Sequence, residues 1–273
     1  MGSEWKKANF GEIVQITMGQ SPKGNTCNSE ENGVPLLNGP TEFGNSFPKP
    51  VQFTIDPKKN AKKGDLLFCV RGSTTGRMNW ADKEYAIGRG LASLRHKNGM
   101  KYQQYLKAVI AYKLPNLLLS ATGSTFPNVS RSQLNTLTIN IPPLPEQKAI
   151  SHILGTLDEK IELNRRMNAT LEQMAHTLFK SWFVDFDPVI DKALAAGNPI
   201  PEPLQKRAEK RKALGDKRKP LPENIQKLFP DAFEFSEELD KWVPKGWEVC
   251  SINEIAEVIG GGTPSTKIEE YYC

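Results

Sequence analysis

The stretch from residue 150 to residue 182, ISHILGTLDEKIELNRRMNATLEQMAHTLFKSW, repeats apolar residues at steps of three and four. This spacing places them along one side of an α-helix. We call this line the seam, and its members are Ile150, Leu154, Leu157, Ile161, Asn164, Asn168, Leu171, Leu178 and Trp182. Two of them are asparagines, which cost stability in such a position but can fix the register of paired helices.

The flanking residues set the limits of this helix. Pro145 suits the first helical position, and Glu146 places a negative charge at the positive end of the helix dipole. Pro188 disfavours helix just before it, so we expect the helix to end near Asp185. About forty residues make a rod of roughly 60 Å. Because a domain of this size cannot enclose such a rod, we predict that the seam meets a partner helix; the alternative is an ordinary core helix with two surface asparagines.

Upstream of the helix, short apolar runs alternate with Gly, Asn, Ser and Pro, which is typical of strands and turns. The runs are Ile13–Thr17, Val34–Leu37, Leu66–Val70, Ala86–Leu94 and Leu137–Ile141. Helical patterns cover Tyr102–Lys113 and Ser130–Leu137. The order is irregular, so we predict an α/β (α+β) domain with a twisted mixed sheet rather than a doubly wound nucleotide fold. Gly19–Gly33 and Gly72–Trp80 are candidate binding loops.

The sequence also repeats itself at long range. Trp5–Pro22 (WKKANFGEIVQITMGQSP) recurs without a gap at Trp247–Pro264 (WEVCSINEIAEVIGGGTP). A period this long indicates duplicated domains, and the second copy stops at Cys273, too soon to bury its own core. We therefore expect either a half-size protein or a fragment of a twofold one, with residues 247–273 weakly ordered or covered by a neighbour. The expected segments are 1–143, a complete first domain; 144–187, the long helix; 188–243, a Pro-rich basic linker; and 244–273, a truncated second copy.

Charge is distributed unevenly along the chain. Residues 1–143 contain 18 Lys and Arg against 9 Asp and Glu, a net charge of +9. A basic globular domain attracts polyanions, most commonly nucleic acid, although a solvated basic surface is the alternative. A second basic run contains Lys206-Arg207, Lys210-Arg211-Lys212 and Lys217-Arg218-Lys219. It is either a solvated helix face or an arm that contacts phosphates without reading sequence.

Several classes of protein do not fit this sequence. No apolar run approaches the ~20 residues that span a bilayer, and the N-terminus has no export signal. The four cysteines are scattered without metal-ligand spacing, so we expect no bound metal and reduced thiols in the cytoplasm. No catalytic constellation persuades either: the glycine-bracketed Gly72–Arg77 lacks the Lys-Ser/Thr ending of a phosphate loop. We therefore expect a binding protein rather than an enzyme.

The candidate binding residues lie on the glycine-rich loops. Arg71, Arg77, Arg89, Arg95 and Arg131 carry forked guanidinium groups that can bond guanine or phosphate in pairs. Polar neighbours can bond phosphates or base edges, although each could instead serve a turn or a helix cap. The candidate DNA-binding residues are Gln20, Lys23, Arg71, Ser73, Thr74, Thr75, Arg77, Arg89, Asn128, Ser130 and Arg131.

With these residues in view, the sequence resembles the specificity subunit of type I restriction-modification enzymes over essentially its whole length. The most specific segments are Ile141–Gln147 (IPPLPEQ), Leu157–Ile161 (LDEKI) and Leu178–Phe186 (LFKSWFVDF). Further matching segments are Gly19–Pro22, Gly64–Leu67, Arg71–Gly76, Thr125–Asn128 (TFPN) and Pro244–Trp247. In that family two target-recognition domains are separated by two long antiparallel helices, and each domain reads half of a split DNA site.

The resemblance implies a non-catalytic subunit that binds double-stranded DNA and no cofactor of its own. S-adenosylmethionine, ATP and magnesium would be held by the modification subunits and the restriction subunit. Because this chain carries one complete recognition domain and one helix, we expect two copies to pair through the seam as an antiparallel coiled coil in a homodimer. Two alternatives remain open: the recognition portion of a fused restriction-methylation enzyme, and a coiled-coil scaffold that reads no bases.

Overall fold

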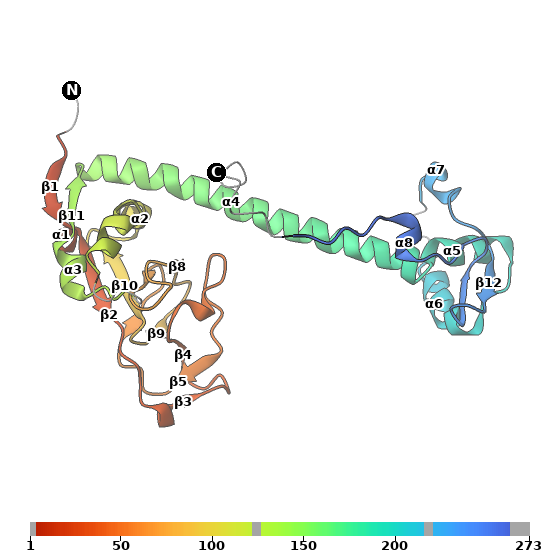
Figure 1. The fold of residues 1–273 in the computed structure, drawn as a ribbon, viewed down its shortest axis with the longest axis horizontal. Helices are drawn as coiled ribbons and strands as arrows, with labels where there is room; N and C mark the ends of the chain where they lie inside the picture. The colour runs from red at the N-terminus through yellow and green to blue at the C-terminus, as the bar shows by residue number, and fades with distance from the viewer. Residues whose placement is uncertain (1–3, 122–126, 216–220, 263–273) are drawn as a thin grey trace. The chain divides into compact units, whose positions relative to one another are not determined.

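A computed structural model describes residues 4–121, 127–215 and 221–262. It divides the chain into two compact units, residues 1–166 and 167–273 (Figure 1). The described residues of the first unit form three β-sheets, helices and the start of the long helix. Those of the second form the rest of that helix, shorter helices and a hairpin.

A four-stranded antiparallel sheet forms the centre of the first unit. Its strand order is β2 (Val14–Met18), β10 (Leu91–His96), β7 (Leu66–Cys69) and β8 (Met78–Trp80). Every neighbouring pair in this sheet is antiparallel. The segments that precede and follow these strands therefore lie at the two ends of the sheet.

A second sheet has five short strands in the order β3 (Cys27–Asn28), β5 (Gln52–Thr54), β4 (Val34–Leu37), β9 (Tyr85–Ile87) and β6 (Asn60–Ala61). It is mixed, because β4 and β9 are parallel whereas the other pairs are antiparallel. The predicted mixed α/β fold is thus confirmed. The single apolar run expected at Ala86–Leu94 is instead two strands, separated by Gly88–Gly90.

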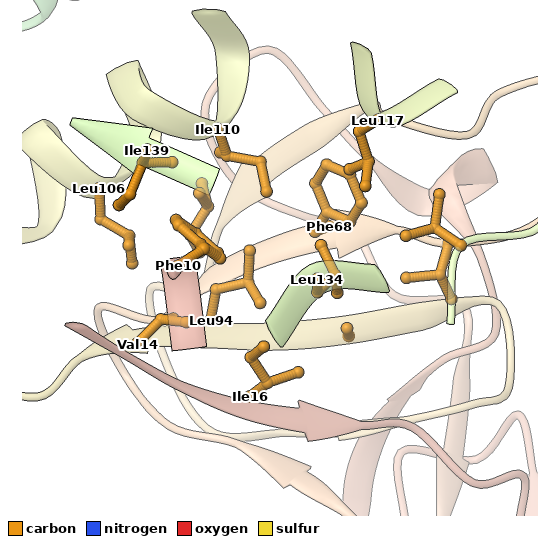
Figure 2. Packing of buried hydrophobic residues seen from close by; sticks show 14 residues of the cluster. Phe10, Val14, Ile16, Phe68, Leu94, Leu106, Ile110, Leu117, Leu134 and Ile139 are labelled. Atoms are coloured by element: carbon orange, nitrogen blue, oxygen red, sulfur yellow. The ribbon is translucent and has the colours of Figure 1, made fainter. Parts of the chain in front are cut away.

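The buried side chains of β7 alternate between two apolar clusters. Leu66 and Phe68 point into one cluster, and Leu67 and Cys69 point into the other, as the pleat of a strand requires. The first cluster lies beneath helices α2 (Gln103–Leu119) and α3 (Arg131–Thr136), whose Leu106, Ile110 and Leu134 meet Phe10 and Leu94 (Figure 2). This core holds the sheet against the helices.

The remaining elements of the first unit join its two chain ends. Strand β1 (Lys6–Asn9) pairs antiparallel with β11 (Thr138–Ile141), which leads directly into the long helix. The one-turn helix α1 (Phe10–Ile13) follows β1 and places the Phe10 side chain, which is fully buried, in the core.

The long helix α4 spans Leu144–Phe179 and continues as a π-helical turn over Lys180–Val184. Its start is fixed to the first unit by two buried polar residues. Gln147 Nε2 donates to the Pro142 carbonyl at 2.8 Å, and the Ser151 hydroxyl accepts from the Tyr105 backbone N–H at 3.3 Å. The helix expected from residue 145 to about Asp185 is therefore confirmed, with a change of hydrogen-bonding pattern in its last turn.

The second unit is more structured than a linker. Residues 188–243, expected as a Pro-rich basic linker, include most of α5 (Asp187–Ala196) and all of α6 (Glu202–Ala213) and the one-turn α7 (Glu223–Gln226). They also contain most of a hairpin of β12 (Phe233–Ser236) and β13 (Lys241–Pro244). A last helical turn, α8, covers Ile252–Ile255. Among the described residues, no helix is long and apolar enough to cross a membrane.

Candidate nucleic-acid interface

The loops that carry the candidate arginines meet at one end of the four-stranded sheet, where β2 and β7 end and β8 and β10 begin. The antiparallel register places Met18, Ala92, Phe68 and Met78 in a row near this end of the sheet. We call the segments that extend from it, residues 19–23, 70–77, 88–90 and 127–131, the loop edge. The last segment joins the others through a backbone hydrogen bond from Val129 to Val70 at 2.9 Å.

The loop between β7 and β8 presents two exposed arginines, Arg71 and Arg77. Glycines with positive φ, Gly72 at 89° and Gly76 at 94°, allow the chain to turn sharply between them. The Thr75 hydroxyl bonds the Gly72 carbonyl at 2.7 Å and the Pro127 carbonyl at 2.8 Å. Thr75 therefore ties two segments together and uses its hydroxyl hydrogen within the protein.

The neighbouring hydroxyl residues of this loop differ in accessibility. Ser73 is exposed, whereas Thr74 is half-buried with its hydroxyl 3.6 Å from the Cys69 sulfur. Ser73 is thus the most accessible hydroxyl group of the loop.

Arg89 projects from a second loop, between Gly88 and Gly90. Its side chain is exposed, and its backbone N–H donates to the Ser21 hydroxyl at 3.3 Å. The exposed Gln20 lies beside this loop because its backbone N–H donates to the Ile87 carbonyl at 2.8 Å. Lys23 is exposed on the same segment. The structure thus brings Gln20, Lys23 and Arg89 to the edge that Arg71 and Arg77 occupy.

The segment before α3 completes the loop edge. Asn128 forms an isolated β-bridge with Arg71. Ser130 caps α3 in a capping box with Gln133, accepting from the Gln133 backbone N–H at 3.2 Å. Arg131 is exposed in the first turn of that helix. Of the matching segment Thr125–Asn128, Thr125 and Phe126 lie outside the described residues.

Arg95 does not belong to this surface. Its Nε donates to Asp65 Oδ1 at 2.5 Å, and its terminal nitrogen donates to the Lys63 carbonyl at 3.1 Å. Asp65 also accepts from the Ser93 hydroxyl at 2.6 Å. Arg95 therefore serves a largely buried ion pair, whereas within the described residues Arg71, Arg77 and Arg89 form no salt bridge.

Two side chains that the sequence analysis did not identify stand next to the loop edge. Asn38 follows β4 and Gln52 begins β5, and the Asn38 side-chain N–H donates to the Gln52 side-chain oxygen at 3.0 Å. The backbone of Asn38 lies against Gly88 and Gly90, which flank Arg89. Nothing in their local sequence could reveal this proximity, because 14 residues separate the two amides and their meeting depends on strand register.

Most of the seam is exposed along α4. Leu157 is 56% exposed, Ile161 49%, Leu171 55% and Leu178 50%, and both Asn164 and Asn168 are exposed. Ile150 and Leu154 are half-buried. Trp182 is also half-buried, with its ring edge against Phe229 at 5.8 Å between centroids. An exposed apolar line of this length marks an interaction surface, because soluble monomers rarely leave one uncovered. The partner helix itself stays a prediction.

The second basic run, expected as either a solvated helix face or a phosphate-contacting arm, is helical over most of its described part. It forms helix α6, in which Arg207 pairs bidentately with Asp187, with both N–O distances 2.8 Å, and Arg211 pairs with Asp191. Burial alone would raise the pKa of Asp187, but hydrogen bonds from Arg207 and Ser181 hold that pKa below its usual range. These arginines hold α6 to α5. Lys206, Lys210 and Lys212 are exposed, and Lys217-Arg218-Lys219 lie outside the described residues.

His96 is buried, and its ring nitrogens form hydrogen bonds within the fold. His96 lies 3.1 Å from Gln147 through Nε2 and accepts from the Asn98 backbone N–H through Nδ1. Burial lowers the pKa of His96, against a smaller opposite effect of the Gln147 hydrogen bond. Through its contact with Gln147, His96 helps to hold the start of α4 in place. Among the described residues, no group of three His, Cys, Asp or Glu could hold a metal ion.

Comparison with known proteins places this geometry in a family. Residues 2–173 match the family described as "Type I restriction modification DNA specificity domain". A putative type I restriction enzyme MjaX specificity subunit from Methanocaldococcus jannaschii is 34% identical over 172 residues, 62% of this chain and 40% of that protein. The type I restriction enzyme HindI specificity subunit from Haemophilus influenzae is 29% identical over 238 residues, 79% of this chain and 52% of that protein.

A solved structure also resembles this one. It comes from work on complex assembly and conformational transition of the type I R-M system, and it matches with a TM-score of 0.50 and 32% identity over 65% of this chain and 44% of that one. The chain thus spans about half the length of the relatives it matches. The match over residues 2–173, together with the mixed sheets and the long helix, shows that this chain belongs to the type I restriction-modification DNA specificity family.

Proposed function

We propose that this chain recognises a specific sequence in double-stranded DNA through the loop edge and directs adenine methylation and restriction by partner subunits. The observation that carries the proposal is the gathering of Arg71, Arg77 and Arg89 at one sheet edge without acidic partners among the described residues. An arginine in this state can bond guanine O6 and N7 bidentately. Family membership supports the same function.

In this proposal the chain performs no chemistry itself. The modification subunits supply S-adenosylmethionine and transfer the methyl group, and the restriction subunit supplies ATP-dependent translocation and cleavage with magnesium. Gln20, Lys23, Ser73, Asn128 and Arg131 assist by bonding phosphates or base edges, whereas the Ser130 hydroxyl is engaged in capping α3. The complex acts in the cytoplasm.

The direct test is co-expression of the full chain with its modification subunit, followed by mapping of methylated adenines. Arg71→Ala and Arg77→Ala should each reduce discrimination between target and random DNA by about 1–3 kcal/mol. Lys83→Ala is the matched control, because Lys83 is an exposed cation beyond the end of β8 farther from the loop edge. Equal loss on target and random DNA in Arg71→Ala would assign Arg71 to the phosphates. A wild-type chain that binds target and random DNA equally would refute base reading and favour the scaffold alternative.

We also propose that two copies pair through the seam as an antiparallel coiled coil. The support is the exposure of Leu157, Ile161, Leu171 and Leu178 along one helix. Two reading domains would then face a symmetric, interrupted DNA site. Sedimentation equilibrium at micromolar concentration should show a dimer for the wild type and a monomer for Leu157→Lys. Glu159→Lys, on the opposite side of the helix from Leu157, should remain dimeric. A monomeric wild type would exclude this pairing.

A further inference from the structure

The amide pair of Asn38 and Gln52 faces an open hollow in the first unit. Gln52 pairs directly with Leu36 across β4 and β5, so these side chains share a face of the sheet, and Asn38 lies on it as well, two residues beyond Leu36. The hollow has a volume of about 500 Å³ and is otherwise lined by Leu36 and by Ser21, Pro22, Gly24, Cys27, Asn28 and Ser29. Both amide side chains are exposed. The pair is therefore accessible to a ligand that approaches the loop edge.

The hydrogen bond between the two amides fixes the orientation of Asn38. The Gln52 oxygen accepts one of the two Asn38 N–H groups at 3.0 Å. The second N–H group and the carbonyl oxygen of Asn38 have no hydrogen-bond partner within the described part of the chain. An amide that presents one donor beside one acceptor can bond N7 and N6 of adenine together, which is the commonest use of Asn in base reading.

The neighbouring glycines let the backbone of residues 88–90 approach Asn38 closely. A Cβ atom on Gly88 would lie 2.6 Å from that oxygen, and a Cβ atom on Gly90 would lie 2.5 Å from the Asn38 backbone oxygen. A side chain at either glycine would therefore displace Asn38, which is itself exposed. Because Arg89 lies between these glycines and is exposed, the amide stands beside an arginine already assigned to the loop edge.

We infer that Asn38 reads an adenine in the major groove and that Gln52 is the positioning residue that orients its amide. This inference rests on the proposed DNA-recognition function and adds a base identity to it. Adenine presents an acceptor next to a donor, whereas guanine presents two acceptors, cytosine a donor and thymine an acceptor with a methyl group. Only adenine satisfies both free groups of Asn38.

The experiment selects bound sequences from a randomised duplex library with the full chain in complex with its modification subunit. Asn38→Asp, which keeps the size but leaves acceptors only, should change one consensus position from adenine to cytosine, because carboxylates accept from cytosine N4. Gln52→Met removes the acceptor that orients Asn38 and should reduce the adenine preference at that position about fivefold or more. Gln52→Glu retains an acceptor and should keep the preference even though total affinity falls.

Asn140→Asp is the matched control, since Asn140 is an exposed asparagine on β11. Thermal unfolding of each variant verifies that it is folded. An unchanged consensus in Asn38→Asp and Gln52→Met overturns the inference and leaves the proposed function standing. A uniform loss of affinity without a change of base also overturns it, because Asn38 would then contact the DNA backbone. A wild-type selection that yields no consensus overturns the proposed function and this inference together.

Discussion

The two copies of the repeated sequence share local structure but differ in which residue packs against the rest of the fold. Both form one helical turn at corresponding positions, α1 at Phe10–Ile13 and α8 at Ile252–Ile255. In the first copy Phe10 is fully buried and Trp5 is 50% exposed. In the second copy Ile252 is 70% exposed, whereas Trp247 packs on Phe183 and Phe186 with ring centroids 6.1 and 5.7 Å away.

This difference shows which part of the repeat is encoded locally. A capping residue followed three positions later by glutamate starts the turn in both copies. Burial of the apolar positions requires a sheet to receive them, and the first copy has β10 beside its own strand β2. Among the described residues of the second copy, no strand follows α8.

The largest difference should come from the position that is core in one copy and surface in the other. Phe10→Ala should lower the free energy of unfolding by about 3–5 kcal/mol, because it empties a buried site. Ile252→Ala, at the same place in the repeat, should change it by no more than about 0.5 kcal/mol. Urea unfolding with hydrogen exchange read in each unit measures both. Similar losses would mean that the second copy is buried in solution.

For the two tryptophans, the substitution in the second copy should cost more stability than the one in the first copy. Trp247→Ala removes two ring contacts and should destabilise the second unit by about 1–3 kcal/mol. Trp5→Ala loses mainly an exposed hydrogen bond from its indole N–H to Glu146 and should cost about 1 kcal/mol or less. The readout is exchange protection of the β12–β13 hairpin. A hairpin that keeps full protection in Trp247→Ala would show that these rings do not stabilise it.

Removing the glutamate at the start of each helical turn should produce a smaller difference in stability between the copies. Glu12 accepts from the Asn9 backbone N–H at 2.7 Å, and Glu12→Ala should cost about 1 kcal/mol. Glu254→Ala affects an exposed turn and should cost no more than about 0.5 kcal/mol. Glu12→Gln keeps the acceptor and should recover most of the loss in thermal unfolding. If Glu12→Gln is as unstable as Glu12→Ala, the charge matters more than the hydrogen bond.

The smallest expected effect is a difference between the two units in how their stability depends on pH. Because the pKa of His96 is lowered in the fold, the unfolded chain binds more protons below about pH 6.5, and the first unit should lose stability as the pH falls from there. The pKa of Asp187 is also lowered, so its contribution persists until the pH falls below 3.8. Between pH 7.5 and pH 5, the free energy of unfolding should fall in the wild type and should depend less on pH in His96→Gln. A slope that His96→Gln leaves unchanged would assign the effect elsewhere.

The long helix was predictable from the sequence because its signal is local. Steps of three and four residues from Ile150 to Trp182 specify a helix whatever surrounds them, and the prolines at positions 145 and 188 bound it. The strand Val34–Leu37 was likewise found as an apolar run. The second unit was not found, because Asp187 and Asp191 identify Arg207 and Arg211 as structural only when α5 and α6 are packed together.

The loop edge was only partly predictable for the same reason. Its arginines were identified by residue type on glycine-rich loops, but residue type also suggested Arg95, which pairs with Asp65. The convergence of residues 20, 71 and 89 depends on antiparallel pairing between residues as far apart as Val14 and His96. Asn38 and Gln52 escaped notice because strands of two to four residues carry too little pattern to reveal their register.

The glycine pair around Arg89 has a consequence for how such a protein could diverge. A side chain at residue 88 or 90 would collide with Asn38, so both flanking positions resist substitution. Residue 89 is exposed, so we expect its side chain to be replaceable without disturbing the core. A single codon change there could therefore give a descendant a new base preference while every strand keeps its place.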